Sequence, residues 1–185
     1  MKPSPIKFER PLQKYQRVIT WSIGLFIFFL ILSTQIPPRK DARQKSYLGQ
    51  AHLPRGIRNN NPGNLRYSPL NNWKGKIPIS QNTDGAFEQF IEWRYGIRAL
   101  LVLLKGYIFR YGTIEAMLRH YAPSNENNTE LYIQRVASDT GIPRNQVVTS
   151  TRETLLKLAI SISRYENGKG YEITETDFQE AYKIM

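Results

Sequence analysis

Arg55-Gly-Ile-Arg-Asn-Asn-Asn-Pro-Gly-Asn-Leu-Arg66 is the stretch that decides the fold of this chain. Its twelve residues include four Asn, two Gly and one Pro. This composition suits consecutive turns in which side chains bond their own backbone. The stretch therefore predicts an irregular segment at the start of a folded domain. For most of the four asparagines, shaping turns is the stronger interpretation, and binding the acetamido groups of sugars is the alternative.

Short extended pieces separated by turns follow this stretch. Ile77-Pro-Ile79 and Phe87-x-x-Phe90 alternate with turn residues at Gly75 and Asp84-Gly85. A small, irregular β-hairpin is expected here, although Pro78 interrupts it.

The rest of the domain has helical periodicity. A buried helix is expected over 95–109, with Gly112 ending it, followed by a short helix from Thr113 to Tyr121. Asn128 and Gly141 bound the next helix, Ser150-x-x-Glu153 opens a helix that ends at Gly168, and Thr174-x-x-Asp177 opens the last one. The fold class is therefore mainly α with a small β part.

Residues 18–36 form an uncharged apolar run, VITWSIGLFIFFLILSTQI, whose 19 residues match the thickness of a bilayer core. A cleaved signal peptide is the rival interpretation, but the run is long and no small-x-small cleavage site follows it. The predicted organisation is a basic tail (1–17), a transmembrane anchor (18–36), a linker (37–53) and one domain (54–185).

The formal net charge of +11 is concentrated near this anchor, because residues 1–45 carry +7 of it. Basic residues that flank an apolar run are typical of membrane topology signals and lipid headgroup contacts. We therefore expect a lipid bilayer as a partner of residues 18–36 and no specific nucleic acid. A slight excess of basic residues before the run favours a cytoplasmic N-terminus, with the domain on the periplasmic side.

Carboxylate chemistry is the catalytic option that the composition favours. The chain has no Cys and two His, and it contains neither a glycine-rich phosphate loop nor an H-E-x-x-H motif. Glu166 lies in the last turn of an expected helix, where the helix dipole and a nearby apolar face would both raise its pKa. A raised pKa suits a general acid, whereas an exposed polar residue at a helix end is the simpler interpretation.

Two parts of the domain resemble a known family. One set of segments resembles a lysozyme-like domain that is found in phage virion proteins and related bacterial proteins. These segments are the Arg55–Arg66 stretch, Phe87-x-x-Phe90, Tyr95-Gly-Ile-Arg-Ala99, Tyr121-Ala-Pro-x-x-Glu126-Asn, Thr129 and Tyr132-Ile133. Leu158–Gly168 resembles the helix that carries the catalytic Glu in lysozymes and lytic transglycosylases. In those enzymes this helix precedes the Asn- and Gly-rich region, whereas here it follows. A circularly permuted lysozyme-like fold would bring Glu166 back beside Asn59–Asn64.

The resemblance implies an enzyme that cleaves peptidoglycan glycan strands, as a muramidase or a lytic transglycosylase, with Glu166 as general acid and no metal or organic cofactor. The candidate substrate-binding residues are Asn60, Asn64, Trp73, Tyr121, Glu126 and Tyr132. Candidates for a second carboxylate are Asp84, Glu88 and Glu92. The alternative function is a non-catalytic wall-binding or virion structural module, and the alternative location is the membrane of a lipid-containing phage virion.

Overall fold

The computed structural model describes residues 45–124 and 128–185. Contacts within the chain divide it into residues 1–39 and residues 40–185, and the described residues all belong to the second unit. The predicted tail and anchor, 1–17 and 18–36, lie outside the described residues. Within the described ranges, no helix combines the length and apolar character that crossing a membrane requires.

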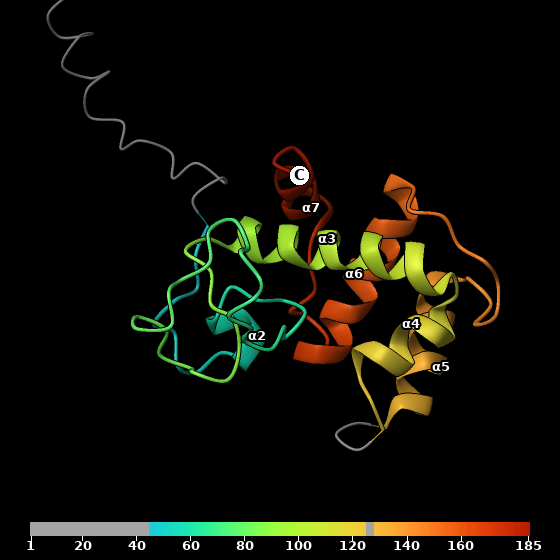
Figure 1. Cartoon of the computed structure of the whole chain (residues 1–185), viewed down its shortest axis with the longest axis horizontal. Coiled ribbons are helices and arrows are strands. Elements are labelled where there is room, and N and C mark those ends of the chain that lie inside the picture. Colours follow the sequence, from blue (N-terminus) through green and yellow to red (C-terminus); the bar gives the residue numbers. More distant parts are fainter. Residues whose placement is uncertain (1–44, 125–127) are drawn as a thin grey trace, which may run out of the picture. The chain divides into compact units, whose positions relative to one another are not determined.

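The described domain is mainly α-helical, as the sequence predicts. Its helices are α2 (Arg55–Arg58), α3 (Trp93–Tyr111), α4 (Ile114–Tyr121), α5 (Thr129–Thr140), α6 (Arg152–Asn167) and α7 (Glu175–Tyr182). Helix α3 runs across the domain, with the irregular region 45–92 at one end and α4 and α5 at the other (Figure 1).

Helix α3 forms the centre of the core because it is apolar on nearly every side. Ile97, Leu100, Leu101 and Leu104 are at most 1 % exposed. They lie at the helix faces that α4, α6 and α7 cover, and α5 packs in turn on α4 and α6. Gly112 ends the helix in the left-handed conformation, as the sequence predicts.

The helix caps follow the sequence closely. The side chains of Thr113 and Asn128 accept hydrogen bonds from the first turns of α4 and α5, and Thr174 and Asp177 form the expected capping box of α7. One cap differs from the prediction. Thr151 rather than Ser150 caps α6, because its hydroxyl accepts the Thr154 N–H at 3.1 Å.

In place of a continuous hairpin, the expected region has two isolated antiparallel bridges, Arg66 to Phe87 and Lys76 to Phe90; a third bridge joins Thr113 to Val147 among the helices, and no continuous strand forms in the described residues. Backbone hydrogen bonds accompany the first two bridges, from the Tyr67 N–H to the Ala86 carbonyl at 3.0 Å and from the Ile77 N–H to the Gln89 carbonyl at 2.8 Å. Turns at the positive-φ residues Gly75 and Gly85 interrupt the extended pieces. Side-chain amides add further bonds to this short pairing.

The irregular region is attached directly to α3. A Cβ on Gly96 would overlap the carbonyl group of Asn60 and lie 3.1 Å from Pro62. Only glycine allows the helix to pass so close to the Asn-rich turns. This close approach positions the turns relative to the helical part of the domain.

Candidate active site

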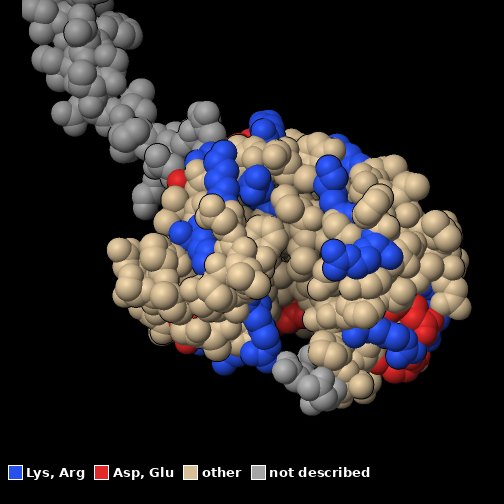
Figure 2. All heavy atoms as spheres, in the orientation of Figure 1, with Lys and Arg blue, Asp and Glu red and all other residues tan. Residues whose placement is uncertain are grey.

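A cleft of about 650 Å³ separates the irregular region from the helices. Its walls come from the Asn-rich turns, the segment 71–87, α3, α4 and the end of α6; the lining residues used below are Arg55, Asn64, Arg66, Trp73, Phe87, Tyr107, His120, Tyr121 and Glu166. Figure 2 shows a hollow on this face with acidic atoms in it and Lys and Arg side chains around it. Among the described residues, Glu166 is the one carboxylate that lines the cleft.

Glu166 is held in the cleft from two sides. Asn64 Nδ2 donates to Oε2 at 3.0 Å, and the Tyr132 hydroxyl donates to Oε1 at 2.9 Å. Burial raises the pKa of Glu166 above its ordinary value, although the bonds from Asn64 and Tyr132 oppose that rise. The carboxyl group is therefore both fixed in direction and easier to protonate than an exposed Glu.

The predicted meeting of Glu166 with the Asn-rich turns is confirmed. Asn64 and Glu166 are 102 positions apart in the chain and share a hydrogen bond. The next residue on α6, Asn167, also reaches the turns, because its Nδ2 donates to the Pro62 carbonyl at 2.8 Å. The end of α6 is thus bonded to the Arg55–Arg66 stretch at two successive residues.

Asn64 is the member of the Asn-rich stretch that faces the cleft. Its backbone has φ of 46°, a left-handed conformation that Asn tolerates better than most residues. The side chain bonds Glu166 at the end of α6 and lines the cleft, and its predicted contact with substrate stays a prediction.

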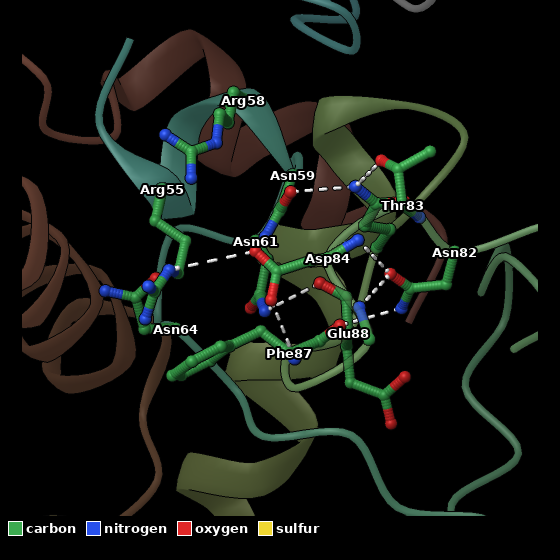
Figure 3. Close-up of polar contacts among 12 residues, drawn as sticks. Arg55, Arg58, Asn59, Asn61, Asn64, Asn82, Thr83, Asp84, Phe87 and Glu88 are labelled. Atoms are coloured by element: carbon green, nitrogen blue, oxygen red, sulfur yellow. Dashed lines mark hydrogen bonds and ion pairs between the residues drawn. The ribbon is translucent and has the colours of Figure 1, made fainter. Parts of the chain in front are cut away.

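Asn60, also predicted to bind substrate, is instead a structural residue. It is 0 % exposed, and its Nδ2 donates to Ser46 Oγ and the Phe90 carbonyl while its Oδ1 accepts the Tyr47 N–H. Asn59 and Asn61 are buried in the same way, against the segment 82–89 (Figure 3). These three amides add to the short backbone pairing that supports the irregular region.

Of the predicted aromatic residues, Trp73 and Tyr121 line the cleft. The Tyr121 hydroxyl donates to the Gly63 carbonyl, which joins α4 to the Asn-rich turns. Tyr132 does not reach the cleft surface, because it is 0 % exposed and stacks on Tyr165 with ring centroids 3.6 Å apart. Its place is behind Glu166, where it orients the carboxyl group instead of stacking on a sugar. Glu126 lies outside the described residues.

The candidate second carboxylates are occupied elsewhere. Glu88 is buried and bonds Lys76 Nζ at 2.9 Å, and Asp84 accepts from Asn59 Nδ2 at 2.9 Å. Glu92 pairs with the neighbouring Arg94 at 2.7 Å. None of the three lines the cleft with Glu166.

Several cleft residues were not predicted from the sequence. Arg55 and Arg66 stand at the two ends of the Asn-rich stretch, and their guanidinium groups lie 4.7 Å and 5.2 Å from the ring centre of Phe87. Their position at both ends of one compact turn segment is a signal that would have placed them near each other. Tyr107 and His120 depend on the packing of α3 against α4, for which the sequence carries no local signal.

No family model matches the chain. A search of curated proteins finds Protein P5 of Pseudoalteromonas phage PM2, which is 35 % identical over 130 residues. The matched region covers 68 % of this chain and 80 % of Protein P5. The chain belongs to the same family as Protein P5 of Pseudoalteromonas phage PM2.

Proposed function

We propose that this protein cleaves the glycan strands of peptidoglycan, with Glu166 as the general acid. The observation that carries the proposal is the placement of Glu166, which lies in the cleft with its carboxyl oxygens bonded to Asn64 and Tyr132 and its pKa raised by burial. A general acid requires this combination of a fixed direction and a pKa closer to neutral pH. The motif resemblance supports a circularly permuted lysozyme-like fold for the domain.

The proposed reaction begins when Glu166 donates its proton to the glycosidic oxygen between N-acetylmuramic acid and N-acetylglucosamine. The bond from that oxygen to C1 of the muramic acid breaks, and the oxygen leaves with the proton. Because Glu166 is the one described carboxylate in the cleft, we favour the route in which the same group then acts as base. It would accept the proton of the C6 hydroxyl of that sugar as this hydroxyl attacks C1, which gives a 1,6-anhydro product.

The chain's setting is part of the proposal. We propose that residues 18–36 anchor the protein in a membrane with the domain on the side of the cell wall. The relationship to a phage protein supports a phage origin and makes a virion membrane the alternative setting.

The test compares the wild type with Glu166→Gln on purified sacculi. We expect the wild type to release muropeptides and the variant to release none, because the amide keeps the shape of the side chain but has no acidic proton to donate. Both proteins should sediment equally with sacculi. Lys183→Gln is the control and should keep full release, because Lys183 lies outside the cleft in an exposed ion pair with Glu180.

The products identify the reaction, because 1,6-anhydro ends show transglycosylation and reducing ends show hydrolysis. Release by Glu166→Gln at the wild-type rate would contradict the role of Glu166. Binding of the wild type to sacculi without any release would show a wall-binding or virion structural module instead.

A further inference from the structure

Among the residues that the structure describes, two buried amide oxygens beside Glu166 have no hydrogen-bond donor. They are Oδ1 of Asn64 and Oδ1 of Asn167. Both lie within 3.0 Å of the point that a Cβ on Gly56 would occupy, and the backbone oxygen of Asn61 is 2.8 Å from the same point. Three oxygens therefore converge on Gly56. A buried acceptor without a donor destabilises the fold, so this arrangement requires an explanation.

The two amides differ in how firmly they are held. Asn167 Nδ2 donates to the carbonyls of Pro62 at 2.8 Å and Ser163 at 2.9 Å, so a rotation of this amide would break both bonds. Within the described parts of the chain, the Nδ2 of Asn64 donates to Glu166 alone, at 3.0 Å to Oε2 and 3.5 Å to the backbone oxygen. Asn64 is therefore the amide that is able to turn, and a half-turn exchanges its oxygen and nitrogen at almost unchanged positions.

The better orientation of Asn64 depends on the proton of Glu166. Opposite an ionised carboxylate, Nδ2 is the correct partner for Oε2. Opposite a protonated Oε2–H, the correct partner is Oδ1, and a turned Asn64 then places Nδ2 on the side of Gly56, where Oδ1 of Asn167 also lies. In the turned form Oδ1 of Asn64 accepts from the carboxyl group of Glu166.

We propose that the side-chain amide of Asn64 turns over when Glu166 gains or loses its proton, and that Oδ1 of Asn167 is the acceptor that stabilises the turned form. Asn64 and Asn167 are then positioning residues that hold the acid proton on Oε2. This inference rests on the proposed role of Glu166. When the proton passes to the glycosidic oxygen, Asn64 turns back and its Nδ2 donates to the new carboxylate.

The other described groups around Glu166 do not replace Asn64 as the hydrogen-bond partner of Oε2. Tyr132 on α5 bonds Oε1 and not Oε2, Tyr121 on α4 faces the carboxyl group, and Tyr165 is its neighbour on α6. Burial raises the pKa of all three tyrosines, so they stay neutral where Glu166 titrates. The remaining titratable groups of the described cleft wall are Arg55, Arg66, Tyr107 and His120.

The test is proton NMR of the full chain in detergent micelles, with the Glu166 carboxyl carbon titrated in parallel. Oδ1 of Asn64 faces Gly56 in the structure, so a turned amide brings the Asn64 Hδ2 protons next to the Gly56 Hα protons. We expect an Hδ2-to-Hα nuclear Overhauser effect to appear as pH falls, with the same midpoint as Glu166. A cross-peak that is present or absent on both sides of that midpoint would overturn the proposal.

Two variants sharpen this test. In Glu166→Gln the cross-peak should no longer change with pH, whereas in His120→Gln it should still follow Glu166. A pH-dependent change of the cross-peak that disappears in His120→Gln would contradict the proposal.

Asn167→Leu removes the acceptor at similar volume. We expect the pKa of Glu166 to fall by about one pH unit, because the protonated form loses its partner. If the Asn64 amide does not turn, the pKa of Glu166 should stay the same, since the Asn167 side chain bonds Pro62 and Ser163 and not the Glu166 side chain. An unchanged or higher pKa of Glu166 would overturn the role of Asn167. Where this variant does not fold, the wild-type cross-peak decides alone. A pH-dependent cross-peak in a protein that releases no muropeptides would uphold the amide exchange and refute the proposed function.

Discussion

Burial and hydrogen bonding act in opposite directions on the carboxyl group of Glu166. Removal from water disfavours the charged form and raises its pKa, whereas Asn64 and Tyr132 donate to the charged form and lower it. Burial is the larger effect, so the pKa stays above its ordinary value. The site thus combines a raised pKa with hydrogen bonds that fix the direction of both oxygens.

Tyr132→Phe separates these two effects. The variant removes the bond to Oε1 but keeps the ring that stacks on Tyr165, so the pKa of Glu166 should rise further. A general acid acts when protonated, and the alkaline limb of muropeptide release should therefore move to higher pH by about one unit. Tyr107→Phe, which removes another cleft hydroxyl, should leave the limb in place. A limb that moves to lower pH would contradict this account.

At the residue scale, the sequence predicts the meeting of Glu166 and Asn64 better than it predicts the groups around them. Each of the two residues belongs to a motif with a local signal. Asn60 and Asn64 are the same residue type in the same stretch, yet one is buried under Ser46 and Phe90 and the other faces the cleft. That difference depends on where α3 and α6 lie, which the composition of the stretch does not contain.

At the scale of elements, the helices follow from the sequence because their signals are local. Caps at Thr113, Asn128 and Thr174 and the left-handed Gly112 and Gly141 end or begin helices where predicted. The expected hairpin region forms two short antiparallel bridges without a continuous strand in the described residues, and contacts from distant amides add to this pairing. An example is Asn61, which bonds the backbone of Glu88 at 2.9 Å.

The two glycines of α3 offer a matched test of how this helix meets the turns. Gly96→Ala forces a Cβ into the Asn60 carbonyl group and should destabilise the domain by about 3 kcal/mol or more. Gly106→Ala adds a Cβ to open space and should stabilise it by roughly 0.5–1 kcal/mol, since Ala favours the helix. Urea unfolding followed by circular dichroism measures both. Equal effects of the two substitutions would show that α3 does not pass close to Asn60.

For the whole molecule, the hydrophobic core of the described residues belongs to the unit 40–185. Its buried apolar side chains come from α2 through α7 and the segments between them. This unit has what a domain of its size needs to fold, and residues 1–39 contain the predicted anchor. Folding and membrane attachment should therefore be separable.

Cell fractionation tests that separation. Full-length protein expressed in a bacterium should stay in the membrane fraction after an alkaline wash, whereas residues 40–185 should be released and unfold cooperatively. The physical reason is that the apolar run 18–36 has the length and hydrophobicity of a bilayer span. If expression of the full-length sequence gives a soluble product that begins after Pro38, the run is a cleaved signal peptide.

The separation of Asn64 and Glu166 along the chain also determines how long after Asn64 the ribosome adds Glu166. The two residues are 102 positions apart, and at translation rates of about 5–20 residues per second roughly 5–20 seconds pass between their syntheses. During that interval the chain contains the Asn-rich wall of the cleft but not Glu166. The proposed cleavage of glycan strands therefore requires translation to the end of α6, the last helix but one.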